Sequence, residues 1–150
     1  MDTVTYPEKK VIDTLAARYV PLRIKFDTQP YTTDFNIKWT PTLITLGPDG
    51  KEHHRTVGFL GVDELIASLL LGEAKFHFDN DRFEPALKCL EQVISQHGAS
   101  ECAAEALFLT GVCQYKSTHD PKPLKAAYEK LAATFPNSEW TKRAYPYRLL

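Results

Sequence analysis

Two different residue patterns divide this chain near residue 60. Before that point, turn-forming residues separate β-branched and aromatic runs, whereas Ala, Leu, Glu and Lys become frequent after it. An apolar residue at every second position predicts a strand, and apolar residues three or four apart predict a helix. We therefore expect an α/β (α+β) unit over residues 1–61, with a small sheet and flanking helices, and an all-α helical stack over residues 62–150.

The first unit is expected to contain a helix and three strands. Residues 7–19 have helical apolar spacing, and Pro7 suits a first helical turn. Residues 20–26 alternate in polarity, which predicts a strand with an apolar face made by Val20, Leu22, Ile24 and Phe26. A short turn or helix is expected near residues 31–35. Strands at residues 42–46 and 51–57 are joined by Gly47-Pro48-Asp49-Gly50, a turn sequence that predicts a hairpin.

The second unit is expected to consist of helices that repeat. Helices are predicted over residues 62–78, 100–116 and 121–134, and from residue 138 onward, with a further helix that has Pro85 in its first turn and ends near Gln96. Gly72 and Gly111 lie 39 positions apart, and the pairs Leu90 with Tyr128 and Val93 with Leu131 lie 38 apart. Such a period is typical of stacked helical hairpins. The two glycines are expected to let paired helices approach closely, and the larger residues to fill the space between hairpins.

Charge and apolar patterning exclude several classes of partner. The net charge is −1, so no broad basic field is expected to attract nucleic acid or acidic lipid. The longest apolar stretch, residues 65–71, is too short to span a membrane, and the charges between Asp2 and Lys10 argue against a signal peptide. Three widely spaced cysteines argue against a disulfide scaffold, which favours a reducing, cytoplasmic location.

No residue pattern predicts a catalytic, metal or cofactor site. Cys89 and Cys113 fall inside helices and are expected to pack in the core, while acidic neighbours are expected to keep Cys102 inert. His53 and His54 are strand neighbours that point to opposite faces, so we expect solvated side chains rather than a metal pair. Asp79-Asn80-Asp81 is expected to be a turn between helices, because it lacks the other ligands of a calcium loop.

The first unit resembles the C-terminal part of a bacterial thioredoxin-like domain. The resemblance is carried by Tyr19-Val20-Pro21-Leu22-Arg23, by Ile37-Lys38-Trp39-Thr40-Pro41-Thr42, by the turn Pro48-Asp49-Gly50-Lys51 and by residues 55–59. It implies that the Thr40–Pro41 peptide bond is cis. It also implies that Trp39, Thr40 and Pro41 form an edge whose backbone binds extended peptides.

The chain departs from that family in one large respect. It has no Cys-x-x-Cys, and the strands and helix that surround this motif would lie before Met1. The missing strand normally separates the two halves that remain, so unpaired backbone edges are expected. Three outcomes are open: a longer gene product in which Met1 is internal, a homodimer that shares strands across a two-fold axis, or a smaller sheet covered by the chain's own helices.

Residues 65–143 resemble tetratricopeptide-type repeats. One unit is carried by Leu71-Gly72, Phe76, Ala86 and Leu90, and a second by Thr110-Gly111, Tyr115, Ala127 and Leu131. The residues after Phe135 resemble the junction before a further repeat or cap. The resemblance implies a concave face that binds a partner protein, for which Phe76, Tyr115 and Tyr128 are the candidates.

Together these patterns favour a non-catalytic module that binds a polypeptide or protein. Two alternatives remain. The chain could be part of a thiol–disulfide oxidoreductase whose Cys-x-x-Cys lies upstream of Met1, or a structural dimer that completes its sheet across a two-fold axis. No cofactor, metal, nucleic-acid or membrane partner is predicted.

Overall fold

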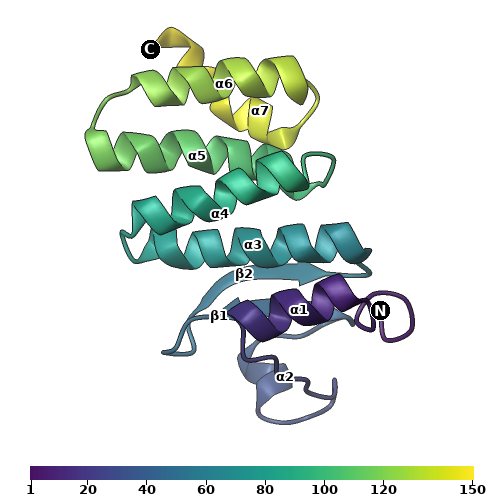
Figure 1. Cartoon of the computed structure of the whole chain (residues 1–150). Helices are drawn as coiled ribbons and strands as arrows, with labels where there is room; N and C mark the ends of the chain where they lie inside the picture. The colour runs from purple at the N-terminus through teal and green to yellow at the C-terminus, as the bar shows by residue number, and fades with distance from the viewer.

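The computed structural model describes residues 1–150 and contains seven α-helices and one small antiparallel sheet (Figure 1), which agrees with the α+β class. In chain order the elements are α1 (Lys9–Arg18), α2 (Tyr31–Asp34), β1 (Thr42–Leu46), β2 (Glu52–Val57), α3 (Val62–Asp79), α4 (Phe83–Gln96), α5 (Cys102–Thr118), α6 (Lys122–Thr134), α7 (Glu139–Ala144) and a 3₁₀ helix (Tyr145–Leu149). None of these helices is long and apolar enough to cross a membrane.

The two strands form the predicted hairpin. Gly50 has a φ of 79°, which glycine adopts without strain, and the Asp49 side chain accepts a hydrogen bond from the Lys51 N–H at 3.1 Å. Both residues therefore stabilise the turn between the two strands. Thr45 pairs with His54 but Leu46 pairs with Glu52, which leaves His53 as an extra residue in a β-bulge. The bulge changes the direction of the His53 side chain relative to a regular strand.

One face of the hairpin lies on α3. Leu43 packs against the main hydrophobic core, and the hydroxyl groups of Thr56 and Ser68 are 2.8 Å apart. A Cβ atom on Gly72 would collide with the side chain of Thr45. The close approach at Gly72 is therefore between α3 and the sheet, and the expectation that this glycine serves a helix pair was wrong.

The helices α3 to α6 are stacked in chain order, each packed against the next (Figure 1). At the α5–α6 contact, a Cβ atom on Gly111 would lie 2.6 Å from Ala127 Cβ, so this glycine does allow two helices to approach closely. Leu90 and Val93 are buried in the main core, and Leu131 is buried in a smaller cluster near the C-terminus.

The main core joins the two predicted units. It contains Val11 of α1 together with buried residues of α3, α4 and α5. Helix α3 covers the sheet on one side and packs against α4 on the other. The sequence boundary at residue 61 therefore falls within one continuous core.

The predicted strand over residues 20–26 is absent. The segment between Tyr19 and Lys25 has no regular secondary structure, and Val20 to Ile24 make no backbone–backbone hydrogen bond. Val20 is 96% exposed and Leu22 is 79% exposed. Alternating polarity indicates only which side chains share a face. A strand also needs a neighbouring strand to pair with its backbone, and the only sheet contains β1 and β2 alone.

Candidate functional site

The predicted peptide edge lies at the start of β1. Trp39 is 69% exposed, Thr40 is exposed, and the Thr40–Pro41 peptide bond is cis, as the resemblance implies. The Thr42 hydroxyl donates to the Trp39 carbonyl at 2.7 Å, and the Gly58 N–H donates to the Pro41 carbonyl at 2.8 Å. These bonds anchor the edge to the hairpin while its outer side chains stay in solvent.

One edge of β1 has no neighbouring strand. The bond between Gly58 and Pro41 makes residues 41 and 58 a hydrogen-bonded pair, and such pairs alternate along an antiparallel ladder. Leu43 and Thr45 therefore direct their backbone groups toward β2. Thr42 and Ile44 direct their N–H and C=O groups away from β2, where the sheet has no third strand.

The first unit exposes apolar and charged side chains. Its exposed apolar residues include Val20, Leu22, Phe26, Trp39 and Phe59. Lys25 and Lys38 are exposed and form no ion pair, whereas Arg23 pairs with Asp2 at 2.8 Å. Residues 20–59 therefore expose apolar area together with unpaired charges of both signs, since Asp27 and Asp34 are exposed and form no ion pair either.

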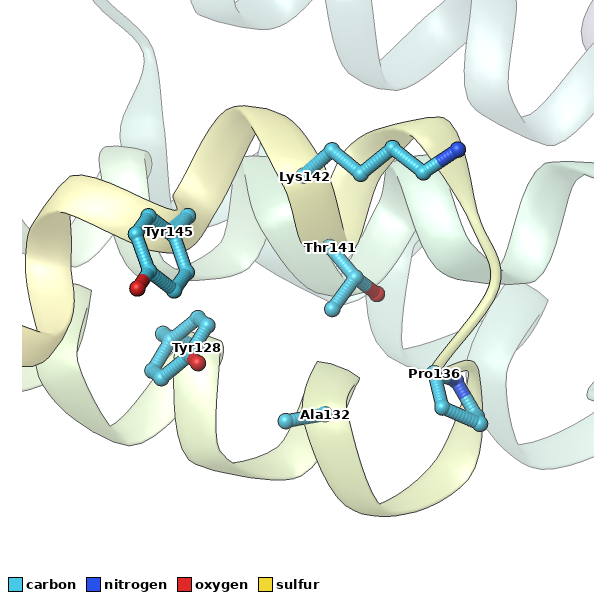
Figure 2. Close-up of a pocket in the computed structure, with 6 residues that line it drawn as sticks. All are labelled: Tyr128, Ala132, Pro136, Thr141, Lys142 and Tyr145. Atoms are coloured by element: carbon cyan, nitrogen blue, oxygen red, sulfur yellow. The ribbon is translucent and has the colours of Figure 1, made fainter.

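The three aromatic residues predicted to form one binding face lie in different surroundings. Phe76 packs on the sheet, with its ring centroid 5.1 Å from that of His53 and the Arg82 guanidinium 4.9 Å above it. Tyr115 on α5 is 39% exposed. Tyr128 meets Tyr145 beside a shallow hollow of about 440 Å³ near the C-terminus (Figure 2). The structure does not bring Phe76 and Tyr128 together, because α3 and α6 are separated by α4 and α5.

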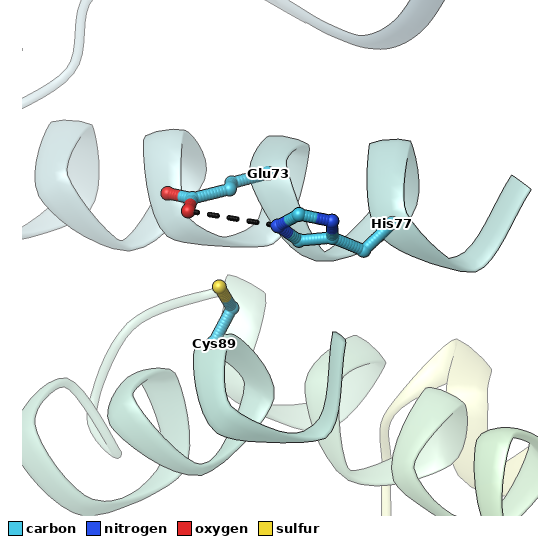
Figure 3. A group of neighbouring side chains, drawn as sticks. All are labelled: Glu73, His77 and Cys89. Atoms are coloured by element: carbon cyan, nitrogen blue, oxygen red, sulfur yellow. Dashed lines mark ion pairs between the residues drawn. The ribbon is translucent and has the colours of Figure 1, made fainter. Parts of the chain in front are cut away.

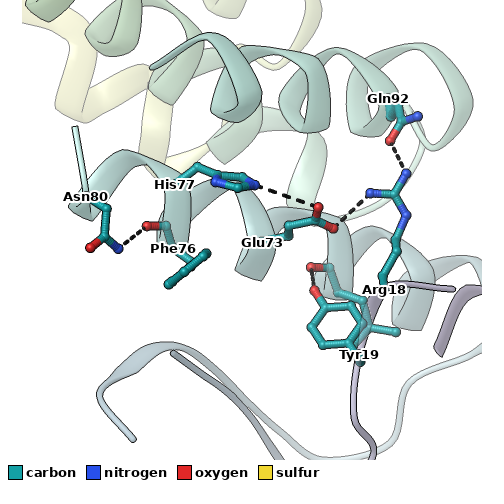
Figure 4. A network of polar contacts seen from close by, with 8 residues as sticks. Arg18, Tyr19, Glu73, Phe76, His77, Asn80 and Gln92 are labelled. Carbon is teal, nitrogen blue, oxygen red and sulfur yellow. Dashed lines mark hydrogen bonds and ion pairs between the residues drawn. The ribbon is translucent and has the colours of Figure 1, made fainter. Parts of the chain in front are cut away.

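A polar cluster that the sequence patterns did not reveal lies where α1, α3 and α4 meet (Figure 4). Arg18 Nη1 donates to Glu73 Oε2 at 2.8 Å, and Arg18 Nη2 donates to Gln92 Oε1 at 3.0 Å. Tyr19 donates through its hydroxyl to the Leu69 carbonyl at 2.5 Å. Burial, with the negative charge of Glu73, raises the pKa of Tyr19, so this hydroxyl stays protonated.

The other oxygen of Glu73 faces a histidine and a cysteine (Figure 3). Glu73 Oε1 lies 3.8 Å from His77 Nε2, and donor atoms of Glu73, His77 and Cys89 all lie within 4.8 Å of one another. Burial and then Arg82 lower the pKa of His77, so its ring is neutral at neutral pH. The sequence signal was the Glu73-x-x-x-His77 spacing, which puts both side chains on one helix face.

All three thiols have raised pKa values. Burial, helped by Glu73, raises the pKa of Cys89 to about 11, and burial raises that of Cys113 to about 11. For Cys102, burial and the nearby Glu64 and Glu105 raise the pKa to about 12. Cys89 and Cys113 are buried, as predicted.

The two adjacent histidines are not solvated, and that expectation was wrong. The His53 side chain is 2% exposed and its Nδ1 lies 2.6 Å from Asp79 Oδ2. His54 Nε2 lies 3.1 Å from the Ser68 hydroxyl. Both side chains contact α3 because the bulge at His53 interrupts the regular alternation of faces. The Asp79-Asn80-Asp81 segment forms the predicted turn, with Asp81 at a φ of 54°.

Comparison of this chain with protein-family models, with curated proteins and with solved structures found no match.

Proposed function

We propose that this chain is a non-catalytic module that binds an extended stretch of polypeptide at the open edge of β1. The observation that carries the proposal is the row of outward N–H and C=O groups at Thr42 and Ile44, which have no strand beside them. An extended peptide can add to such an edge as a further strand. The neighbouring exposed Trp39 supplies an aromatic contact of the kind that dominates binding energy at interfaces.

The charges around the edge favour a particular partner. Lys38 is exposed, forms no ion pair and directly precedes Trp39, so a peptide that alternates apolar and acidic residues would complement it. Antiparallel pairing of residues 20–26 with a second copy, centred on Ile24, would instead place Arg23 of each copy opposite Lys25 of the other. Like charges on facing strands destabilise a pair, which disfavours a homodimer built through this segment.

The raised thiol pKa values support a role without thiol chemistry. The thiolate is the nucleophile in disulfide exchange, and all three cysteines here favour the protonated form. We expect that dithiothreitol reduces insulin disulfides at the same rate with the purified chain as without it. Turnover comparable to that of a thioredoxin would refute the non-catalytic assignment.

We also propose two fold assignments. The first unit is the C-terminal part of a thioredoxin-like domain, and the helices after it are tetratricopeptide-like repeats. The order of packing from α3 to α6 and the close contact at Gly111 support the second assignment. The hairpin and its attachment to Trp39 support the first.

Peptide binding is tested by calorimetric titration with a short synthetic peptide that alternates valine and glutamate. We expect saturable binding, and we expect N-methylation of alternate peptide amides to abolish it, because the methylated backbone cannot donate to β1. Trp39→Ala should weaken binding about tenfold or more. Leu149→Ala is the matched control, because Leu149 is 75% exposed at the other end of the molecule.

Two outcomes of that titration would count against the proposal. Equal binding of the methylated and unmethylated peptides would show that the β1 edge is not used. A concentration-dependent dimer in light scattering, together with no peptide binding, would favour the alternative in which a second copy covers the sheet.

The open edge also fits a second candidate function. A further strand beside β1 could satisfy its unpaired edge, and that strand could belong to a longer polypeptide carrying Cys-x-x-Cys. In that case the whole protein would be a thiol–disulfide oxidoreductase. The DNA upstream of Met1 tests this directly, because an in-frame Cys-x-x-Cys would support the candidate and a nearby stop codon would eliminate it.

A further inference from the structure

We propose that Glu73, His77 and Cys89 bind a zinc ion that links α3 to α4, with water as the fourth ligand. The proposal is independent of peptide binding, because the cluster lies between helices α1, α3 and α4 and involves no residue of the β1 edge.

The donor atoms are close to the arrangement that a tetrahedral ion needs. Zinc bonds of about 2.0–2.3 Å at tetrahedral angles place neighbouring donors roughly 3.3–3.8 Å apart. Glu73 Oε1 and His77 Nε2 are 3.8 Å apart, and all three donors lie within 4.8 Å of one another. Figure 3 shows the Cys89 sulfur pointing from α4 toward the two side chains on α3. Small side-chain rotations would bring the three donors onto one ion.

The imidazole of His77 lacks the hydrogen bonds that its surroundings would require. Its Nδ1 atom is buried without a partner, and its Nε2 atom is beyond hydrogen-bonding distance of Glu73. A polar ring in this position costs free energy unless something satisfies it. Coordination through Nε2 would give that nitrogen the strong contact it lacks with Glu73, and Nδ1 would carry the ring N–H.

Glu73 is already oriented by a second layer of contacts. Arg18 occupies Oε2 at 2.8 Å and is itself held by Gln92 at 3.0 Å, which leaves Oε1 directed at His77 (Figure 4). Such outer contacts fix ligand geometry in metal sites. The positive charge of Arg18 also offsets part of the negative charge that a carboxylate and a thiolate would bring to the ion.

The donor set selects the type of metal. One imidazole, one carboxylate and one sulfur suit zinc, whereas calcium and magnesium prefer oxygen donors only. Coordination replaces the Cys89 S–H bond with a sulfur–zinc bond, and the proton leaves to solvent. The ion would then join two helices that are adjacent in the stack, so we expect zinc to stabilise the fold.

The site is tested by titrating chelator-treated protein with Co²⁺, which reports on zinc sites through its absorption spectrum. We expect saturation at a single equivalent, a near-ultraviolet band from sulfur-to-cobalt charge transfer, strong visible bands of tetrahedral geometry, and loss of all of them on adding zinc. Failure of the wild-type chain to produce the sulfur band would overturn the proposal without any variant.

Variants assign the band to this cluster. Cys89→Ser should remove the sulfur band and lower zinc affinity more than about a hundredfold, since even outer contacts are worth about 10–100-fold. Cys113→Ser is the matched control, because Cys113 is equally buried but belongs to α5 and lies outside the cluster. Retention of the band in Cys89→Ser, or its loss in Cys113→Ser, would place the metal elsewhere and contradict the proposal. His77→Gln, expected to weaken binding at least tenfold, gives the same answer if Cys89→Ser does not fold.

Discussion

His54 is held neutral between the sheet and α3. Its Nδ1 atom lies 3.2 Å from the Lys75 ammonium group, which also pairs with Glu105 at 2.5 Å. Burial, followed by the charge of Lys75, lowers the pKa of His54 to about 4. Protonating this ring in the folded chain would place a second positive charge beside Lys75 in a half-buried position.

We expect acid to weaken the fold through His54. The ordinary histidine pKa is about 6.5, so between about pH 6.5 and 4 the unfolded chain binds more protons than the folded one. The free energy of unfolding should therefore fall as pH decreases through this window, by about 2 kcal/mol between pH 7 and 5. Urea denaturation at the two pH values measures this difference.

Two variants test this pH dependence: His54→Asn is the test variant and His119→Asn is its control. The first removes the buried imidazole and should reduce the pH dependence by about 2 kcal/mol. The second replaces an exposed histidine at a φ of 59°, a conformation that asparagine tolerates, and should change nothing. The same pH dependence in all three proteins would contradict the role assigned to His54.

For single residues, the burial of a side chain was easier to predict than the direction in which it points. Helical spacing placed Cys89 and Cys113 in the core, because a residue's face follows directly from the helical repeat. The faces of His53 and His54 depend on a bulge, which depends in turn on how β2 pairs with β1. The meeting of Cys89 with Glu73 and His77 required knowing which faces of α3 and α4 touch, and no local pattern contains that information.

The contact between α5 and α6 depends on Gly111. A Cβ atom there would meet Ala127 Cβ at 2.6 Å and the Pro123 carbonyl at 3.0 Å, and both are parts of the neighbouring helix. By contrast, a Cβ atom on Gly61 would meet nothing within 4 Å, and its φ of −67° suits any residue. The two glycines therefore form a matched pair for testing helix packing.

Gly111→Ala should destabilise the chain by about 1–2 kcal/mol. Overpacking costs about 1–3 kcal/mol, and the better helix propensity of alanine offsets up to about 1 kcal/mol of it. Gly61→Ala meets no steric clash and should cost less than about 1 kcal/mol, since alanine is a poorer N-cap of α3 than glycine. Urea denaturation of both variants measures the difference, and equal stabilities would show that α5 and α6 are not packed as closely as the structure indicates.

Element types were largely predictable, whereas the pairing of elements was not. The helices from α3 to α6 and the hairpin follow from apolar spacing and turn residues within a few positions of their ends. Residues 20–26 carry the same kind of local signal, but the structure offers their backbone no partner. A strand depends on distant residues in a way that a helix does not.

The main core joins the first unit to the helical stack, and a smaller cluster lies near the C-terminus. Val11 from the first unit and buried leucines of α3 and α4, such as Leu71 and Leu90, belong to the same cluster. The smaller C-terminal cluster shares Ile94 as a neighbour with the main one. Sequence composition predicted a change of structure near residue 60, but it could not show that α3 would serve both the sheet and the helical stack.

We expect the chain to unfold in a single cooperative transition. The fluorescence of Trp140, which packs at the C-terminal end beside Phe108, should follow the same urea dependence as the far-ultraviolet circular dichroism of the whole chain. A Trp39→Phe variant isolates the Trp140 signal. Two separated transitions would show that the repeats unfold independently, as in loosely coupled arrays.

The central claim is that the outer edge of β1 receives an extended peptide, and amide hydrogen exchange measured by NMR tests it most directly. In the free chain, the Thr42 and Ile44 amides should exchange faster than those of Leu43 and Thr45, which face β2. Adding the valine–glutamate peptide should slow exchange at Thr42 and Ile44 by more than about tenfold and leave Leu43 and Thr45 nearly unchanged. Unchanged exchange at Thr42 and Ile44 in the presence of saturating peptide would contradict the account.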